Sequence, residues 1–266
     1  MEISGNIRKM EVSSGDIVGY RLQLGNEKIL MNQLIGSQIS MTFQGVISCI
    51  RCGAVTRKSF AQGYCYPCFS TAPETEECVL RPELCRAHEG IARDMEYASK
   101  HCLSEQVVYL SVSSGLKVGV TRASQVPVRW IDQGAIMAIE LARVPNRFTA
   151  GEIELALKAN MSDKTNWRKM LTGDVPGNIN LPEEKKRAAQ FLPENLAQYV
   201  SEDNMVHEFE YPVAKYPEKV KSLNFDKEPE VTGILSGIKG QYLIFEDNSV
   251  INMRKFGGYL IRFRIA

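Results

Sequence analysis

Polar and apolar residues alternate at both ends of the chain, and this period of two is typical of β-strands. Residues 1–48 hold several short stretches of this kind, and residues 229–266 hold further ones. We expect the strands of the two ends to pair antiparallel in one small barrel or sandwich, which would bring the termini together. Turn-forming residues separate the C-terminal strands at Gly240, Asp247-Asn248 and Gly257-Gly258.

The middle of the chain, residues 103–172, predicts a module that begins with two strands. Residues 107–112 and 116–121 are both rich in β-branched and apolar side chains. The three residues between them, 113–115, are two serines and a glycine, which suit a hairpin connection. We therefore expect a β-hairpin at the start of this module.

The same module continues with alternating helices and a strand. Pro127 is tolerated in the first turn of a helix and Gly134 suits a helix end, so a short helix is predicted between them. The apolar residues 135–144 predict a buried strand, and residues 148–161 have apolar side chains at helical spacing. A further short helix is expected to begin with Asp163 as its N-cap. The predicted order is β-β-α-β-α-α.

The segments on either side of this module differ from it in composition. Residues 49–102 are rich in Cys, Gly and Pro and lack periodicity, as expected where metal binding organises the backbone. Residues 173–228 begin with a loop rich in Gly, Pro and Asn and predict a helix over 182–199. The predicted fold class is therefore α+β, with terminal antiparallel strands, a zinc-binding region, a central module and a linker with a helix.

The composition limits the number of domains, the kinds of partner and the cellular compartment to be expected. The 266 residues suffice for about two domains, and the net charge of +1 indicates no global surface for nucleic acid or membrane. The first ten residues lack the apolar core of a signal peptide, and the longest apolar stretch, 135–142, is interrupted by Glu140 and too short to cross a bilayer. We expect a cytoplasmic protein with no membrane partner, whose seven cysteines are metal ligands or buried thiols rather than disulfides.

Four of the cysteines form two Cys-x-x-Cys knuckles, Cys49 with Cys52 and Cys65 with Cys68, separated by twelve residues. In such a knuckle two thiolates converge on one ion while backbone N–H groups donate to sulfur, and Gly53 relieves the tight turn. Four sulfur ligands favour Zn(II) over harder cations, although an S₄ site can also hold iron. We expect a zinc ribbon with one structural ion here.

A second zinc site is predicted from the cysteines that follow. Cys85 and His88 have the spacing of a Cys-x-x-His knuckle, and Cys78 and Cys102 lie on either side of it. These four residues fit the ligand chemistry of zinc, but the outer spacings of six and thirteen residues match no standard finger. The alternative is a set of small buried thiols with a surface histidine.

Four positions of the central module form a pattern in chain order. They are Tyr109 in the first strand, the tripeptide Lys-Val-Gly at 117–119 in the second, Arg129 on the first helix and Glu154 on the later helix. This pattern resembles the core of the GIY-YIG nuclease superfamily, in the branch whose second tripeptide begins with lysine. The chain is also similar, over nearly its full length, to an uncharacterised bacterial family with a domain of unknown function, in which a zinc ribbon precedes this core.

The resemblance implies a GIY-YIG-like β-β-α-β-α module and a metal-dependent phosphodiester nuclease. Glu154 would bind Mg(II) or Mn(II), Arg129 would stabilise the developing charge, and Tyr109 with Lys117 would position the phosphate or water. At about 100° per helical residue, Glu154 lies about 60° from the centre of the apolar stripe and can face the module's edge. Lys117 replaces the tyrosine usual in members that cleave, and as a cation with an ordinary pKa of about 10.4 it would hold a phosphate.

Other interpretations of these residues stay open. Arg129 can belong to a surface ion pair and Glu154 can be a solvated helix residue, and a degenerate module can act as a non-catalytic adaptor for a protein or RNA partner. Trp167 lies in a basic segment that either binds single-stranded nucleic acid or is a solvated face around a packed tryptophan. The basic residues of this segment are Lys158, Lys164, Arg168 and Lys169. Nucleic acid, DNA or RNA, and a protein are therefore the partners considered.

Overall fold

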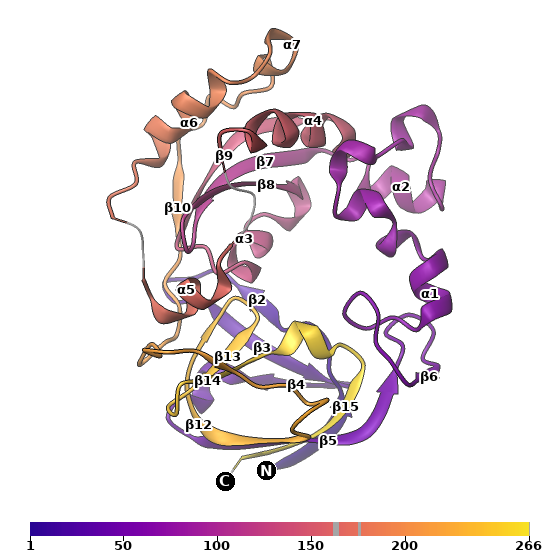
Figure 1. The fold of residues 1–266 in the computed structure, drawn as a ribbon, viewed down its shortest axis with the longest axis vertical. Coiled ribbons are helices and arrows are strands. Elements are labelled where there is room, and N and C mark those ends of the chain that lie inside the picture. The colour runs from indigo at the N-terminus through magenta and orange to yellow at the C-terminus, as the bar shows by residue number, and fades with distance from the viewer. Residues whose placement is uncertain (162–164, 175–176, 266) are drawn as a thin grey trace. The chain divides into compact units, whose positions relative to one another are not determined.

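A computed structural model describes residues 1–161, 165–174 and 177–265 of the chain. Its contacts divide the protein into two compact units. Unit 1 consists of Met1–Ser70, Leu171–Asp174 and Phe209–Ala266, and unit 2 of Thr71–Met170 and Val175–Glu208. The sheets are almost entirely antiparallel and are accompanied by short helices, so the predicted α+β class is confirmed (Figure 1).

Unit 1 is built around one large sheet with the strand order β1-β15-β5-β12-β13-β14-β11, and β6 pairs with β5. We predicted that the strands of the two chain ends pair, and in the structure β15 lies between β1 and β5 (Figure 1). Phe263 is opposite both Ile3 and Met41 in this arrangement. The strands are β1 (Glu2–Asn6), β5 (Gln38–Ser48), β6 (Val55–Thr56), β11 (Lys221–Ser222), β12 (Glu230–Lys239), β13 (Tyr242–Phe245), β14 (Ser249–Asn252) and β15 (Tyr259–Ile265).

A smaller three-stranded sheet completes unit 1. It consists of β2 (Glu11–Ser13), β3 (Gly19–Leu24) and β4 (Glu27–Leu30), followed by the 3-10 helix η1 (Met31–Leu34). Alternate residues of β3 are buried, which is the period of two expected of a strand with one face in a core. Gly240 and Gly258, and Asn248 between them, adopt positive φ at the predicted turns of the C-terminal strands. A further 3-10 helix, η7 (Met253–Phe256), follows β14.

Unit 2 contains a four-stranded antiparallel sheet with the order β10-β9-β7-β8. Every residue of the central strand β7 is buried, because neighbouring strands and helices cover both of its edges and faces. The helix α4 packs on β7 and β8, and α6 packs on β9. The elements are β7 (Gln106–Val112), β8 (Leu116–Arg122), η6 (Ala123–Gln125), α3 (Val128–Asp132), β9 (Met137–Val144), α4 (Arg147–Lys158), α5 (Trp167–Thr172), α6 (Leu181–Ala189), α7 (Glu194–Ala197) and β10 (Val206–Glu208). The order of β7 to α5 is the β-β-α-β-α-α order that periodicity indicated.

Two helix boundaries differ from those expected. The helix predicted over 182–199 is divided into α6 and α7, because Pro193 cannot continue a helix and instead lies at the N-cap of α7. Asp163, the predicted cap of the preceding helix, lies outside the described residues. In the structure α5 begins at Trp167, and the side chain of Asn166 accepts the backbone N–H of Lys169.

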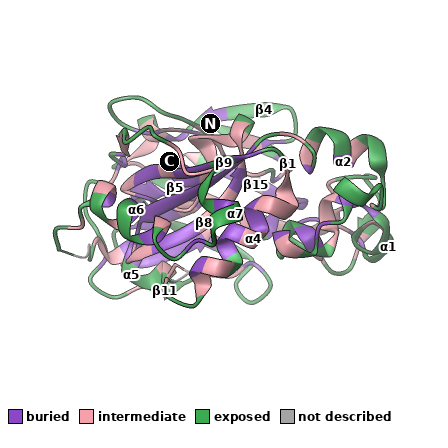
Figure 2. Cartoon of the chain, turned by 90° about the horizontal axis from the view of Figure 1, so that it is seen from above, coloured by how far each residue is buried: buried purple, intermediate pink, exposed green. Residues whose placement is uncertain are grey.

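The Cys-rich segment consists mainly of single helical turns. After α1 (Tyr66–Thr71) come η2 (Pro73–Thr75), η3 (Glu77–Val79), η4 (Pro82–Leu84), η5 (Ala87–Glu89) and α2 (Met95–His101). In Figure 2 the strand β9 is largely buried and β5 and β8 consist mainly of buried and intermediate residues, whereas α1 and α2 are mostly exposed or intermediate. The contacts divide residues 49–102, expected as one region, after Ser70, so the first cysteine knuckles belong to unit 1 and the later cysteines to unit 2.

Helix α4 approaches the segment around η4 very closely. A Cβ atom added at Gly151 would lie 2.2 Å from the backbone nitrogen of Glu83, so only glycine fits at this crossing. At the start of the same helix, the backbone N–H of Arg147 donates to the carbonyl of Cys102 at 2.7 Å. The Cys-rich part of unit 2 is therefore tied to α4 at two points. Among the described residues, none of the helices is long and apolar enough to span a membrane.

Candidate metal centres and a buried polar cluster

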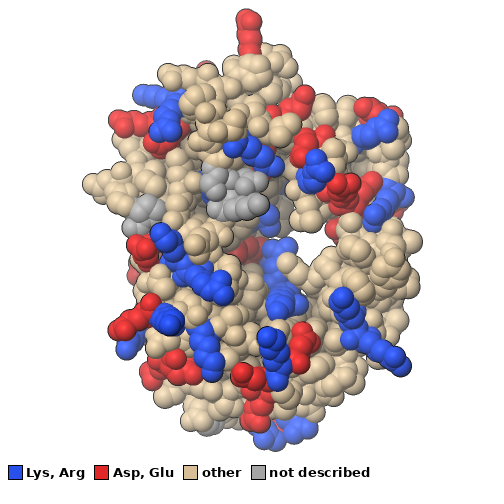
Figure 3. Space-filling view, in the orientation of Figure 1, with Lys and Arg blue, Asp and Glu red and all other residues tan. Residues whose placement is uncertain are grey.

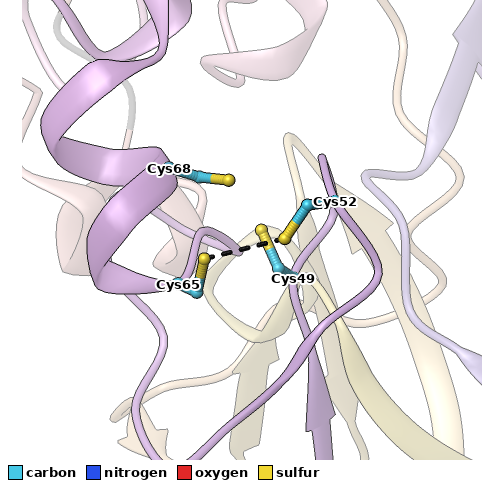
Figure 4. A group of neighbouring side chains, drawn as sticks. All are labelled: Cys49, Cys52, Cys65 and Cys68. Carbon is cyan, nitrogen blue, oxygen red and sulfur yellow. Dashed lines mark hydrogen bonds between the residues drawn. The ribbon is translucent and has the colours of Figure 1, made fainter.

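The four cysteines of the two knuckles come together at the end of β5. Cys49 and Cys52 lie in the loop that follows this strand, Cys65 directly precedes α1, and Cys68 is on α1. Their four sulfur atoms lie within 4.8 Å of one another and point toward a common centre (Figure 4). The sulfur atoms of Cys52 and Cys65 are 3.8 Å apart. Zn–S bonds of about 2.3 Å give a tetrahedral edge of about 3.8 Å, so this group has the dimensions of a zinc site.

The backbone around Cys49 favours the thiolate that a metal needs. Burial alone would raise the pKa of this thiol, but hydrogen bonds from the backbone N–H groups of Cys52, Cys65 and Arg51 outweigh it and lower the pKa to about 6. Gly53 has a φ of +75°, and its N–H donates to the Cys49 carbonyl at 2.9 Å. This is the tight turn that the knuckle spacing predicted, and the group can hold a metal ion.

A second sulfur group lies in unit 2. The sulfur atoms of Cys78, Cys85 and Cys102 lie within 4.8 Å of one another, and all three residues are buried. Hydrogen bonds from the thiols of Cys102 and Cys78 lower the pKa of Cys85. His88, predicted as the fourth ligand, is not part of this group: its ring stacks on Phe148 with centroids 4.4 Å apart. The structure thus brings together three of the four predicted ligands.

Tyr109 and Gly119 face each other across the β7–β8 pair. A Cβ atom at Gly119 would lie 2.6 Å from the hydroxyl oxygen of Tyr109, so the tyrosine ring occupies the space over this glycine. The ring also packs edge-on against Trp130 with centroids 5.8 Å apart. The first and second positions of the pattern found in the sequence are therefore in direct contact, and Tyr109 is fully buried.

Gln133 links Tyr109 to Lys117. Its Oε1 atom accepts a hydrogen bond from the Tyr109 hydroxyl at 2.7 Å and from the Lys117 ammonium at 2.8 Å. Lys117 is only 3 % exposed, so it needs such a partner. Sequence reasoning did not select Gln133, although it lies four residues after Arg129 and therefore one helical turn further along.

Arg129 and Glu154 complete the surroundings of Tyr109. Burial raises the pKa of Tyr109 to about 12, the charge of Arg129 and a hydrogen bond to it act in the opposite direction, and the charge of Glu154 raises it further. Glu154 is itself 9 % exposed and pairs with Lys158, with the Nζ and Oε2 atoms 3.6 Å apart. Residues from β7, β8, α3 and its C-cap, and α4 thus form one polar cluster, in which three members are buried and Arg129 and Gln133 are half-buried. The buried members are Tyr109, Lys117 and Glu154.

The basic segment around Trp167 presents fewer unpaired positive charges among the described residues than its sequence suggested. The guanidinium of Arg168 lies over the Trp167 ring at 4.3 Å, and the tryptophan is half-buried. Lys158 pairs with Glu154, and Lys164 lies outside the described residues. Lysine and arginine are interspersed with aspartate and glutamate over the face shown in Figure 3. This distribution matches the net charge of +1.

A second buried lysine lies in unit 1 and serves as a contrast. Lys239, at the end of β12, is 1 % exposed, and its Nζ lies 5.3 Å from the ring centres of both Tyr211 and Tyr216. Burial lowers its pKa to about 8. The two tyrosine rings supply cation–π attraction but no carboxylate, so this lysine is only partly compensated when charged.

The fold and these groups define an α+β protein with two cysteine groups that can bind metal. The chain belongs to the family described as "Protein of unknown function (DUF2797)", whose model matches residues 36–261. This match agrees with the similarity to a family with a domain of unknown function that the sequence indicated. No curated protein and no solved structure matches the chain. The family description names no activity.

Proposed function

We propose that this protein binds the phosphodiester backbone of nucleic acid at the polar cluster of unit 2 and cleaves it with the aid of a divalent metal ion, while zinc in the four-cysteine group stabilises the fold. The observation that supports the proposal is that three residues expected from the sequence lie around Tyr109, although the four come from different elements. Lys117 shares the Gln133 acceptor with Tyr109, and Arg129 and Glu154 both act on the tyrosine electrostatically. Two cations and a carboxylate are the groups that phosphate chemistry uses.

Each residue has a distinct role in the proposed reaction. Arg129 offers a guanidinium that can pair with two phosphate oxygens, and Lys117 adds a second positive charge. Glu154 would hold Mg(II) or Mn(II), which keep most of their water ligands and so need only one or two carboxylates. The bound ion would supply activated water. Tyr109, whose pKa is about 12, keeps its proton near neutral pH and acts as a hydrogen-bond donor rather than a base.

A cleavage assay with matched variants tests this proposal. Purified protein is incubated with single- and double-stranded DNA and RNA, with and without Mg(II) or Mn(II). We expect metal-dependent cleavage that falls at least about 100-fold in Arg129→Ala and Glu154→Gln, because both remove charge from the reacting centre. Glu152→Gln, on the same helix and directed away from the apolar stripe, is the control and should keep full activity. Equal activity in all variants would contradict the assignment.

A non-catalytic adaptor is the second candidate, and the burial of the cluster favours it. Tyr109 is fully buried and Lys117 is 3 % exposed, which suits a module that builds a rigid surface for a protein or RNA partner. In this case no cleavage occurs with either metal, and binding does not change in Arg129→Ala or Glu154→Gln. Lack of any nucleic-acid binding at low salt would leave a protein as the partner.

A further inference from the structure

The three-cysteine group of unit 2 has no fourth protein ligand among the described residues. Within the group that the structure brings together there are three sulfur atoms and no nitrogen or carboxylate oxygen. The histidine expected to complete it, His88, stacks on Phe148, and its Nε2 atom lies 3.8 Å from a carboxylate oxygen of Glu89. Zinc prefers four ligands, so a protein that supplies three leaves one position for a ligand from outside.

We infer that Cys78, Cys85 and Cys102 hold a second zinc ion whose fourth coordination position is open and is taken by water or by a small neutral nitrogen donor such as imidazole. This inference does not depend on the proposed phosphodiester site. It assigns the second ion a kind of coordination that differs from that of the four-cysteine group. Zinc sites with three protein ligands and one exchangeable ligand are the kind that perform chemistry, whereas closed sites stabilise folds.

A pocket beside the sulfur atoms provides room for such a ligand. Its volume is about 200 Å³, and all three cysteines line it. Leu84, Ile91 and two alanines, Ala87 and Ala92, form an apolar wall. The space is large enough for an imidazole-sized molecule and is bordered by the metal ligands themselves.

The two carboxylates at the pocket are already engaged elsewhere. Glu76 and Glu77 both line it. An oxygen of Glu76 accepts the backbone N–H of Arg93 at 3.3 Å, and an oxygen of Glu77 pairs with Arg81 at 3.2 Å. Neither belongs to the group that converges with the sulfur atoms. The two glutamates therefore place negative charge in the pocket wall but do not supply the fourth zinc ligand.

The charges around the group favour a neutral fourth ligand. Zn(II) with three thiolates carries a net charge of −1, and an anionic ligand would raise it to −2 next to Glu76 and Glu77. Arg147 can compensate a single negative charge: its Nη1 donates to the carbonyl of Cys78 at 3.4 Å, and its buried Nε has no hydrogen-bond partner among the described residues. Arg86 also lines the pocket, but its charge is paired with Glu89, with the Nε and Oε2 atoms 2.7 Å apart. Water or imidazole therefore suits this site better than azide or phosphate.

Cobalt substitution of the full-length protein tests the inference. Co(II) replaces zinc in sulfur sites, and its visible absorption changes with the identity and number of its ligands. We expect about two metal ions per chain in the wild type and one in Cys85→Ser. Imidazole should shift the absorption of the wild type in a saturable manner, and this shift should be absent in Cys85→Ser. Azide should need a concentration at least about ten-fold higher than imidazole.

Two histidine variants distinguish an open site from a closed one. If the fourth position is open, His88→Ala keeps both the cobalt absorption and the imidazole response of the wild type. His101→Ala, whose histidine stacks on Tyr97 in α2, is the matched control for loss of an aromatic side chain in this segment. Altered cobalt bands in His88→Ala, together with no imidazole response in the wild type, would overturn the inference. A metal content of one ion per chain in the wild type would overturn it as well.

Discussion

The two units of the protein contain the same kinds of groups in different arrangements. Unit 1 has four converging cysteines and a buried lysine, Lys239, that faces aromatic rings. Unit 2 has three converging cysteines and a buried lysine, Lys117, that is hydrogen-bonded to Gln133. In unit 1 the four sulfur atoms make up a full tetrahedral set, and Lys239 faces two tyrosine rings. In unit 2 the three sulfur atoms leave a fourth metal-coordination position open, and Lys117 belongs to a polar cluster that could bind a phosphate. The groups that could take a ligand therefore lie in unit 2.

The largest expected difference between the units follows from removing one cysteine from each group. Cys65→Ser should lose the ion of unit 1 and destabilise this unit by several kcal/mol, because structural zinc contributes directly to folding. Cys85→Ser should also lose one ion, with a smaller loss of stability, since an open site has fewer protein ligands bound to its ion. Zinc content by mass spectrometry and thermal unfolding measure both. A larger loss of stability in Cys85→Ser would reverse the comparison.

The two lysines should respond to pH in different ways. The folded-state pKa of Lys239 is about 8, below its ordinary value of 10.5, so the unfolded state binds more protons between these pH values. Stability therefore rises as the pH rises from about 8 to 10.5 and falls as the pH is lowered over the same window, with no further change below 8. Lys239→Met should stabilise the protein by up to about 3 kcal/mol at pH 7, and this gain should vanish near pH 10.5.

The matched substitution in unit 2 is Lys117→Met. Because Lys117 donates to Gln133, its removal leaves a half-buried amide oxygen with one hydrogen bond fewer, and no gain in stability is expected at pH 7. Urea unfolding of both variants at several pH values supplies the measurement. If Lys117→Met stabilised the protein, the charges of both lysines would be destabilising in the folded state. The two units would then not differ in how they accommodate a buried lysine.

The packing of Tyr109 over Gly119 makes the polar cluster part of the core of unit 2. Gly119→Ala places a methyl group 2.6 Å from the tyrosine hydroxyl oxygen, so we expect a loss of about 2 kcal/mol. Gly115→Ala in the adjoining hairpin is the control, because nothing lies within 4 Å of its added carbon. Equal unfolding midpoints for the two variants in urea would argue against this packing.

The smallest expected effect concerns the shared acceptor of the cluster. Gln133→Leu removes the oxygen that accepts from both Tyr109 and Lys117 and should cost about 1 kcal/mol. Gln133→Glu keeps an acceptor and adds a charge beside Lys117, so it should cost less than the leucine variant. Equilibrium unfolding of both variants checks the order, and a more damaging glutamate would show that the cluster already holds enough negative charge.

Local sequence signals predicted much of this protein. The knuckle spacing of Cys49 to Cys68 brings the sulfur atoms together within a short loop and one helix, so the group could be found without knowledge of the fold. The strands and helices from β7 to α5 were likewise visible as periods of two and 3.6 residues. In both cases the structure depends on residues that are close in the sequence.

Long-range contacts account for the rest. The Cys85-x-x-His88 spacing suggested a ligand pair, but the position of the histidine is decided by Phe148, far along the chain. Gln133 became part of the cluster only through contacts with two strands. The burial of Lys239 carries no sequence signal, because a lysine in an alternating strand is ordinarily expected to face solvent. Such features require the tertiary structure.

Helix α4 has a consequence for communication within unit 2. Its first residue, Arg147, donates a backbone N–H to Cys102, and Glu154 lies seven residues, or about 10 Å, further along the axis. Gly151 between them leaves no free space against η4, so the helix cannot shift at one end alone. A metal ion bound at the three-cysteine group and a phosphate bound at the polar cluster would therefore both contact elements attached to helix α4. Where binding at one site changes the affinity at the other, thermodynamic linkage requires that the reverse effect have the same factor.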